Sequence, residues 1–379
     1  MKGLKNISDT QVEFAGIGGT EMQAEGLQSL FPMEELSIMG LVEILPQIPK
    51  MLKRIAETAR NILDFKPDAL ITIDSPDFCL RVARKVRKSG SDIKTIHYVA
   101  PTVWAWRPGR AAKMAKTIDH VLALFPFEPP YMQTAGMTCD FVGHPIVEEK
   151  QATIAEAEAF RDSHDIAKDV PLLTVLPGSR GSEVSYLSPI FREVAEKVVA
   201  AVPETRVVIP TVPHLADRLR EEFANSSAAP LILDPGQMPS NKVMAEKRAC
   251  FAASDLALAA SGTVSLELAA ASTPMVIAYR GNALSEFLAR KMALIDTVTL
   301  VNILTETRDV PEYLLGDCTV ENITPAVLNL LSDPVLADKQ KQSGKVAIDM
   351  LGRGGEAPGV LAAKSVLTAI GQPRTGIKA

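Results

Sequence analysis

Two aspartates at the end of an apolar run could supply a catalytic base. They lie in IDSPDF, where Asp74 directly follows the run ALITI and Asp77 follows a proline. A carboxylate at the carboxyl end of a buried strand can face a ligand, and partial burial would raise its pKa towards that of a general base for a sugar hydroxyl. Aspartate is also common in turns and at helix starts, and spacing alone slightly favours this structural role.

A glycine-rich turn in LPGSRGSEV (residues 176–184) could hold a phosphate group. Gly178 and Gly181 allow a sharp turn and a close approach of the backbone to a ligand, and Ser179 lies between them. Arg180 offers a forked, permanently charged donor that suits a diphosphate. The GK[ST] ending of a Walker motif is absent. The alternative, a tight strand-to-helix turn with a surface arginine, stays open.

A second turn, SGTVSLE, also follows an apolar run and opens a helix. The amide groups of Ser261, Gly262 and Thr263, together with the helix dipole, could bind an anion. Glu267, one turn into the helix, could reach a ribose. The alternative is a capped helix without a ligand. A third glycine-rich segment, GIGG at residues 16–19, lacks the full spacing of a dinucleotide fingerprint, so the sequence predicts no NAD site.

Both tryptophans of the chain, Trp104 and Trp106, lie in one segment, HYVAPTVWAWRPGR. An exposed tryptophan is unfavourable unless it packs on something such as a sugar face or an acyl chain, so these rings could contact a substrate. Equally, the segment could fold onto its own core. His97, at the start of the segment, is expected to make an ordinary structural hydrogen bond.

The candidate residues follow expected strands, which alternate with helices along the chain. In the first half we expect strands at residues 12–16, 69–74, 94–99, 120–125 and 141–142, and helices at 41–63 and 80–88. In the second half we expect strands at residues 172–176, 206–210, 231–233, 255–260 and 275–279, and helices at 190–201 and 265–271. This alternation predicts an α/β fold of two Rossmann-like domains with parallel sheets, divided within residues 148–170. Such domains bind ligands beyond the carboxyl ends of their strands.

Composition excludes several classes of protein. The chain has 379 residues, enough for two domains, and 47% of them are hydrophobic and 22% charged, as in an ordinary globular protein. A net charge of −5 argues against a general nucleic-acid binder. The four cysteines include no CxxC pair, which argues against a disulfide scaffold or a zinc site and fits a reducing cytoplasm. Residues 1–9 lack the apolar core of a signal peptide.

Two segments could contact a membrane surface. No apolar run approaches the roughly 20 residues that span a bilayer, so we expect any contact to be peripheral. Residues 81–116 are basic, and the expected helix at 41–63 mixes apolar and cationic residues. Both suit an anionic surface, where each nearby cation contributes about 1 kcal/mol. For the 41–63 helix alone, a solvated face over the core is the more common arrangement.

Read in order, the chain contains GIGG, MQAEG, SIMG, IDSPDF, HYVAPTVWAWR, LFPFEPP, FVGHP, LPGSRGSE, ASGTVSLE, PMVIAYR and VNIL. Together these segments resemble the lipid-A-disaccharide synthase family over nearly the whole chain, and HYVAPTVWAWR and LPGSRGSE are the most specific of them. The resemblance implies the GT-B fold of glycosyltransferase family 19. It also implies an inverting reaction without metal or cofactor, in which UDP-2,3-diacylglucosamine and 2,3-diacylglucosamine 1-phosphate (lipid X) give the β-1,6-linked disaccharide and UDP.

The resemblance also implies roles for individual residues. The implied catalytic residues are Asp74, as general base, and Arg180, which stabilises the departing diphosphate. The implied binding residues for UDP are Gly178, Ser179, Arg180, Ser261, Gly262, Thr263, Glu267 and Asn302. Weaker assignments, to the acceptor side or to loop structure, are Asp77, Trp104 and Arg107.

The implied organisation has three parts. Residues 1–150 would form the acceptor and membrane-facing domain and residues 151–348 the donor domain. Residues 349–379 would form a helical segment that packs back on the first domain or on a partner subunit. The implied partners are the UDP-sugar, lipid X and the anionic cytoplasmic surface of the inner membrane, with a homodimer as an open alternative and no nucleic acid.

The chain departs from the family pattern at its start. The family begins with a strand, a GExSGD turn and a helix, whereas residues 1–6 resemble only the last turns of that helix. We therefore expect the first strand and turn of the N-terminal domain to be missing, which would expose neighbouring strand edges. Two alternatives stay open: another GT-B enzyme of UDP-sugars, such as an epimerase, and a nucleotide-sugar or lipid-binding protein without catalytic activity.

Overall fold

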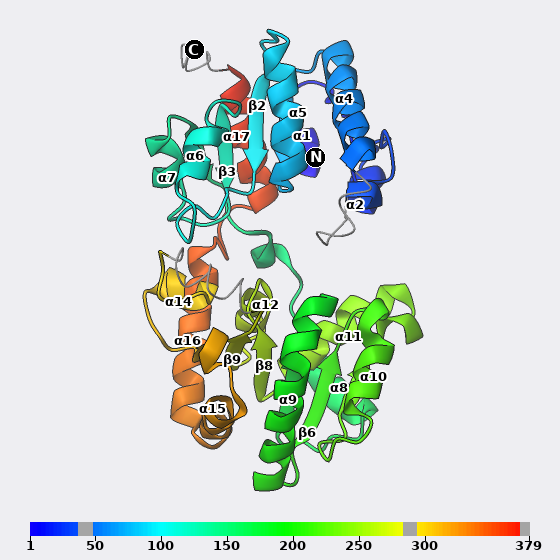
Figure 1. Cartoon of the computed structure of the whole chain (residues 1–379), viewed down its shortest axis with the longest axis vertical. Helices are drawn as coiled ribbons and strands as arrows, with labels where there is room; N and C mark the ends of the chain where they lie inside the picture. The colour runs from blue at the N-terminus through cyan, green and yellow to red at the C-terminus, as the bar shows by residue number, and fades with distance from the viewer. Residues whose placement is uncertain (37–47, 283–293, 372–379) are drawn as a thin grey trace. The chain divides into compact units, whose positions relative to one another are not determined.

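The computed structural model describes residues 1–36, 48–282 and 294–371, and the chain divides into two units that each centre on a parallel sheet (Figure 1). Unit 1 consists of Met1–Glu148 and Gly354–Ala379, and unit 2 consists of Glu149–Arg353. Each unit has its own buried apolar core. The expected α/β class with parallel sheets is confirmed.

Unit 1 contains a four-stranded parallel sheet with the order β1-β2-β3-β4. Its strands are β1 (Ala69–Ile73), β2 (Lys94–Tyr98), β3 (His120–Ala123) and β4 (Thr138–Phe141). Its helices are α1 (Lys2–Ile7), α2 (Thr20–Ala24), η1 (Met33–Leu36), α4 (Ile48–Phe65), α5 (Pro76–Lys88), α6 (Gly109–Met114), α7 (Pro129–Thr134), η3 (Pro145–Glu148) and α17 (Pro358–Gly371). Each strand pairs with its successor in the sequence, so the carboxyl ends of all four strands lie at one edge.

Apolar helix faces cover this sheet. In α4 the buried residues Ile55, Ala59 and Ile62 recur every three to four positions, which places them on one face of the helix. They share a core with α5 and with β1, β3 and β4. A second apolar cluster packs Leu4 of α1 and Val366 of α17 against β2 and β3. Helices from both ends of the described chain thus stabilise the same sheet.

The helix α17 is attached to unit 1 by polar contacts as well. The Ser365 hydroxyl donates to Asp140 Oδ2 at 2.7 Å and lies 2.7 Å from His120 Nε2. Gly359, near the start of α17, lies very close to Gly3 of α1. A β-carbon on Gly3 would overlap the carbonyl oxygen of Gly359. The two helices therefore lie side by side.

Unit 2 contains a six-stranded parallel sheet with the order β10-β9-β8-β5-β6-β7. Its strands are β5 (Leu172–Leu176), β6 (Arg206–Pro210), β7 (Leu231–Leu233), β8 (Leu256–Ala260), β9 (Met275–Tyr279) and β10 (Glu312–Leu314). Its helices are α8 (Ile154–Ser163), α9 (Gly181–Ala201), η4 (Pro213–Leu215), α10 (Ala216–Phe223), η5 (Pro235–Gln237), α11 (Ser240–Ala253), α12 (Val264–Ala270), α14 (Leu300–Thr305), η6 (Leu315–Asp317), α15 (Val320–Ser332) and α16 (Pro334–Met350).

The order of this sheet reverses beside β5. The chain runs from β5 outward to β6 and β7 and then returns to β8 on the other side of β5. The central strands β5 and β8 are buried along their whole length, as expected for strands covered on two faces. The turns after β5 and β8 therefore leave neighbouring strands at the switch point, where parallel sheets bind ligands.

Several elements differ from those expected from the sequence. Residues 12–16 form no strand, since an isolated bridge between Gly16 and Ser29 is their one sheet-like pairing. The short strand β10 was not anticipated, because its three residues are all half-buried and form no apolar run. Helix α9 begins well before the expected residue 190 and includes Pro189, which is exposed and removes one backbone hydrogen bond without ending the helix.

The expected helix at 41–63 corresponds to α4, which begins at Ile48. Residues 41–47 lie outside the described part of the chain. The helix expected at 80–88 begins at Pro76, because proline is favourable in the first turn of a helix. Asp77 therefore lies within the first turn of α5 rather than in a loop before it.

Candidate functional site

A carboxylate from the first turn of α9 holds the turn between β5 and α9. Glu183 Oε2 accepts the backbone N–H groups of Ser179 at 3.0 Å and of Arg180 at 3.3 Å. Glu183 Oε1 lies 2.5 Å from a guanidinium nitrogen of Arg180. Gly178 has φ +119°, and a β-carbon there would come within 2.5 Å of the Glu183 side chain, so this position requires glycine.

The turn between β8 and α12 is more open. The Ser261 N–H donates to the carbonyl oxygen of Ala278 at 2.9 Å, which fixes the turn to β9. Gly262 and Thr263 are exposed, and a β-carbon on Gly262 would meet nothing within 4 Å. Glu267, on α12, forms an ion pair with Lys247 of α11. This turn therefore leaves space beside its backbone. The Glu267 carboxylate on the following helix already has a cationic partner, Lys247.

The two turns line one pocket of about 700 Å³ within unit 2. Its charged lining residues are Arg180, Glu183, Glu246, Lys247 and Glu267. Its apolar lining residues are Leu176, Pro210, Val212, Pro213, Leu233, Pro235, Met238, Val243, Met244, Ala260 and Val264. A forked cation, carboxylates and an apolar wall in one cavity suit a ligand that combines an anionic group, hydroxyl groups and a flat ring.

In unit 1, Asp74 lies at the carboxyl end of β1, where the backbone is strained. Asp74 and Ser75 have φ +45° and +41°, and Val99, directly after β2, has φ +79°. Positive φ is unfavourable for residues other than glycine, and most of all for a β-branched valine. Such strain concentrates at ligand sites. The exposed Asp74 carboxylate therefore lies at a strained edge of the sheet, and the exposed Asp77 follows it on α5.

His97 makes the structural hydrogen bond expected for it. It is 2% exposed, and its Nδ1 lies 2.7 Å from the Thr72 hydroxyl. Burial lowers the pKa of His97 to about 4, although the nearby Asp74 carboxylate opposes this shift. The ring is therefore neutral at neutral pH and links β1 to β2.

The two tryptophans lie in different surroundings. Trp104 is buried, its Nε1 donates to Glu128 at 3.2 Å, and its ring packs edge-on against Phe127 with centroids 5.1 Å apart. Trp106 is 36% exposed, and the guanidinium of Arg107 lies 4.3 Å from its ring centroid. Trp104 therefore anchors the segment in the core, whereas Trp106 and Arg107 form its exposed part.

Glu128 connects this segment to the end of β3. It is 1% exposed, and its Oε2 accepts the backbone N–H groups of Leu124 and Phe125, both at 3.1 Å. Burial raises the pKa of Glu128 to about 7, although the two amides and the Trp104 indole N–H favour the carboxylate. A buried acid therefore holds the Trp104 loop in place.

Comparison with known proteins identifies the family. The family model described as lipid-A-disaccharide synthetase matches residues 2–357. The chain belongs to this family. A lipid-A-disaccharide synthase of Ruegeria pomeroyi is 54% identical over 367 residues, which are 97% of this chain and 90% of that protein. One from Rhodospirillum centenum is 47% identical over 370 residues, 98% of this chain and 90% of that protein.

Solved structures confirm the GT-B fold. A UDP-GlcNAc 2-epimerase from Neisseria meningitidis, bound to UDP-GlcNAc, matches with a TM-score of 0.58 at 13% identity, covering 92% of this chain and 86% of that one. An alpha,alpha-trehalose 6-phosphate synthase from Burkholderia multivorans matches with a TM-score of 0.55 at 11% identity, covering 88% of this chain and 77% of that one. At these identities the likeness concerns the fold alone, so it does not make this chain an epimerase.

The structure brings together most of the residues that the family resemblance implies for UDP binding. Gly178, Ser179, Arg180, Ser261, Gly262, Thr263 and Glu267 all line the pocket of unit 2. Asn302 is not among the lining residues. It is fully buried on α14 and hydrogen-bonds the backbone of Val310.

Sequence reasoning missed three residues of these sites. Glu183 is the final residue of LPGSRGSE. Its carboxylate can contact the turn only because Gly178 has a positive φ. Lys247 lies on α11 and pairs with a residue of another helix, so no local motif marks it. Glu128 lies within LFPFEPP, where a glutamate between an aromatic residue and two prolines is the local signal for it.

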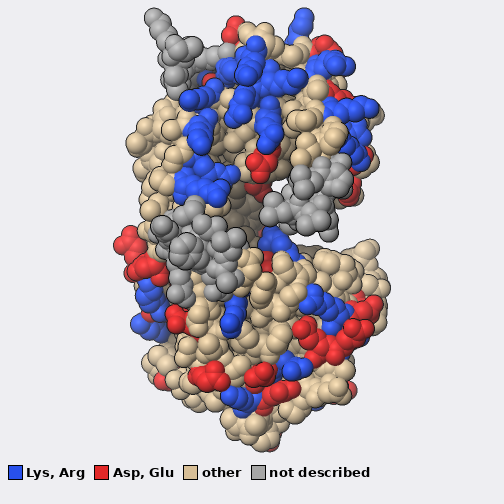
Figure 2. All heavy atoms as spheres, viewed as in Figure 1, with Lys and Arg blue, Asp and Glu red and all other residues tan. Residues whose placement is uncertain are grey.

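A basic surface covers part of unit 1. Figure 2 shows Lys and Arg side chains gathered over the region of α5, whose exposed basic residues are Arg81, Arg84, Lys85 and Lys88. On α4 the apolar Ile48 and Leu52 are 41% and 52% exposed, next to the exposed Lys53. No helix among the described residues is long and apolar enough to cross a bilayer.

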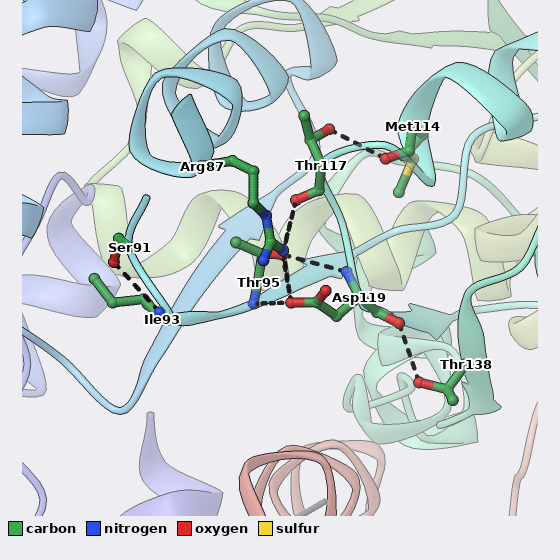
Figure 3. A network of polar contacts seen from close by, with 8 residues as sticks. All are labelled: Arg87, Ser91, Ile93, Thr95, Met114, Thr117, Asp119 and Thr138. Atoms are coloured by element: carbon green, nitrogen blue, oxygen red, sulfur yellow. Dashed lines mark hydrogen bonds and ion pairs between the residues drawn. The ribbon is translucent and has the colours of Figure 1, made fainter. Parts of the chain in front are cut away.

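Arg87 of α5 is basic but does not belong to the exposed basic surface of unit 1. Arg87, on the same helix, forms an ion pair with Asp119 at 2.8 Å and donates to Thr95 Oγ1 at 2.7 Å (Figure 3). Burial raises the pKa of Asp119, but the Thr95 amide and the Arg87 guanidinium outweigh it, so the net shift is downward. Arg87 therefore closes the amino-terminal edge of β2 and β3 and is a structural residue.

Proposed function

We propose that the chain is a glycosyltransferase of lipid A disaccharide synthesis, which transfers 2,3-diacylglucosamine from UDP to the 6-hydroxyl group of lipid X. The observation that carries the proposal is the meeting of the LPGSRGSE and SGTVSLE turns at one pocket in a chain of this family. Relatives named for lipid A disaccharide synthesis align with nearly all of the chain, which supports the same activity here.

Unit 2 would bind the UDP donor. The Arg180 guanidinium would pair with the diphosphate, which would be bordered by the backbone of Gly178 and Ser179 and by the turn from Ser261 to Thr263. Glu267 would accept hydrogen bonds from the ribose hydroxyl groups. As the bond from the anomeric carbon to UDP breaks, negative charge develops on the diphosphate. A guanidinium held at that place stabilises the charge most in the transition state.

Unit 1 would supply the base. Asp74 would take the proton of the acceptor's 6-hydroxyl group as that oxygen attacks the anomeric carbon of the donor. Because UDP leaves from the opposite face, the configuration inverts. The strained backbone at Asp74 and Ser75 supports this assignment, since strain of this kind is retained where it positions a functional group. The exposed Asp77 and Arg107 would contact the acceptor, and the burial of Trp104 favours its role in loop structure.

The surface of α4 and α5 would bind the anionic cytoplasmic face of the inner membrane. Helix α5 carries four exposed cations, the neighbouring helix α4 exposes Ile48 and Leu52, and this combination suits a peripheral contact. The contact would hold the acceptor side of the enzyme at the membrane. A homodimer also remains a proposal.

Disaccharide formation from UDP-2,3-diacylglucosamine and lipid X tests the function. Asp74→Asn is expected to lower kcat by about 100- to 10,000-fold, the usual contribution of a general base. Arg180→Ala is expected to lose about 2–4 kcal/mol of transition-state stabilisation. Matched controls are Asp68→Asn, an exposed aspartate just before β1, and Arg206→Ala, an exposed arginine at the start of β6. Both controls lie at the opposite edge of their sheets.

The outcomes separate the proposed transferase from a binding protein. Turnover by the wild type, reduced in both site variants and kept in both controls, would support the proposal. A wild type that binds UDP but forms no disaccharide would favour a binding protein without catalytic activity. Near wild-type turnover by Arg180→Ala would refute the role of that residue.

A further inference from the structure

The Glu183 carboxylate contacts the same cation that the proposed donor site offers to a diphosphate. Its Oε1 lies 2.5 Å from Arg180 Nη1, and its Oε2 accepts the backbone N–H groups of residues 179 and 180. Both residues line the pocket. An anion that pairs with Arg180 must therefore compete with a carboxylate of the protein itself.

The two members of this ion pair are held very differently. The Glu183 side chain is 19% exposed and folds over Gly178, whereas the Arg180 side chain is 58% exposed. The carboxylate keeps two backbone hydrogen bonds if the guanidinium leaves, so the turn keeps its anchors. Arg180 can therefore exchange partners while Glu183 stays in place.

We propose that Glu183 is a positioning residue that competes with the donor diphosphate for Arg180 and thereby sets the affinity for phosphate-bearing ligands. Without an anionic ligand Arg180 pairs with Glu183, and with one it pairs with the diphosphate while Glu183 remains on the amides of the turn. A nucleoside without phosphate does not need this exchange. This inference rests on the proposed function for the identity of the anion.

A simpler role for Glu183 is to cap α9, and the chain contains a matched capping residue outside the pocket of unit 2. Glu156 occupies the same position on α8, where its carboxylate accepts the backbone N–H of Thr153 at 2.8 Å and pairs with Lys150 at 2.8 Å. Glu156 does not line the pocket of unit 2. Glu156→Gln therefore reports what the loss of a capping charge does by itself.

The test is isothermal titration calorimetry of the full chain with UDP, inorganic pyrophosphate and uridine. Glu183→Gln is expected to bind UDP and pyrophosphate about two- to fivefold more tightly than the wild type, which corresponds to the strength of an exposed ion pair. Its affinity for uridine is expected to stay unchanged. The gain should shrink as salt is added, because salt screens exposed pairs. Glu156→Gln should match the wild type for all three ligands.

Removing a negative charge near the ligand would tighten binding even without competition for Arg180. A double-mutant cycle distinguishes this general effect from the release of Arg180. In an Arg180→Gln background, Glu183→Gln is expected to leave UDP affinity unchanged, because there is no guanidinium to release. An equal gain in both backgrounds would overturn competition for Arg180. So would a Glu183→Gln variant that keeps the wild-type circular dichroism spectrum but gains no affinity.

The wild type provides a measurement that does not depend on folding of the variant. Hydrogen exchange of residues 179 and 180 is expected not to increase when pyrophosphate binds, since Glu183 keeps the turn amides. Faster exchange there would overturn the inference. If neither UDP nor pyrophosphate bound the wild type, both the proposed donor site and the proposed role of Glu183 would be refuted. If both bound and Glu183→Gln changed nothing, only the role of Glu183 would fall.

Discussion

Replacing Asn302 with alanine is expected to destabilise unit 2 rather than to act only on nucleotide binding. The Asn302 side chain holds both backbone groups of Val310: Nδ2 donates to the carbonyl oxygen at 2.9 Å, and Oδ1 accepts the N–H at 3.0 Å. Its Nδ2 also lies 3.3 Å from Thr297 Oγ1. One amide thus holds the loop between α14 and β10 at two points and the segment before α14 at a third.

The size of the effect follows from these contacts. Val310 is 1% exposed, so water cannot readily replace the lost amide. Each buried polar group left without a partner costs about 1–3 kcal/mol, so the two backbone groups of Val310 predict a loss of about 2–6 kcal/mol in the free energy of unfolding. Because a typical domain is stable by only about 5–15 kcal/mol, the loss would be large.

Urea denaturation followed by circular dichroism would measure this loss. Asn241→Ala is a suitable control because Asn241 is exposed on α11, where a substitution changes stability by about 0.5 kcal/mol or less. Under conditions in which Asn302→Ala is folded, its UDP affinity should be near that of the wild type. An unchanged unfolding curve with UDP affinity reduced by about tenfold or more would refute this reasoning and make Asn302 a nucleotide ligand.

Three further outcomes are expected. Glu267→Gln should weaken UDP binding by about 1.5–3 kcal/mol, because a charged acceptor for the ribose is lost, without weakening pyrophosphate binding; calorimetry would contradict the assignment if both weakened equally. The folded-state pKa of Glu128 is raised to about 7 from 4.5, so the stability that this group contributes is present below pH 4.5 and is lost as the pH rises to 7. Relative to Glu128→Gln, the wild type should lose about 3 kcal/mol of unfolding free energy across that window, and a difference that urea denaturation finds independent of pH would speak against it. Combined Arg84→Glu and Lys85→Glu should reduce sedimentation with anionic phospholipid vesicles, by about 1 kcal/mol or more per reversed charge, and undiminished sedimentation would count against the membrane contact.

The central strands and the donor turns could be predicted from the sequence because their signals are local. The runs around Leu172–Leu176 and Leu256–Ala260 are apolar throughout, as strands buried on both faces must be. The glycines and the arginine of LPGSRGSE lie together within one turn. Local pattern failed at residues 12–16, because an alternating segment does not reveal whether a partner strand is available to pair with it.

The remaining features depend on contacts that the sequence does not display. Glu128 is buried, and its partner, the indole N–H of Trp104, comes from a segment 24 residues earlier. Lys247 matters because α11 brings it to Glu267. The positive φ at Asp74 is imposed by the surrounding fold, since nothing in IDSPDF requires it. A pattern can therefore identify which residues are chemically suitable, but only the fold decides which of them have partners and strain.

The charges that line the pocket of unit 2 indicate that directed contacts, rather than net charge, govern donor binding. Two cations, Arg180 and Lys247, lie among three carboxylates, Glu183, Glu246 and Glu267. Long-range attraction for a diphosphate is therefore weak, and binding depends on direct contacts such as the exchange of the Arg180 ion pair and the hydrogen bonds to Glu267. The exposed cations of α5 act at a distance on an anionic surface, where salt screens them strongly. Added salt should accordingly weaken vesicle binding much more than UDP binding, and equal salt dependence would contradict the division of roles between the two surfaces.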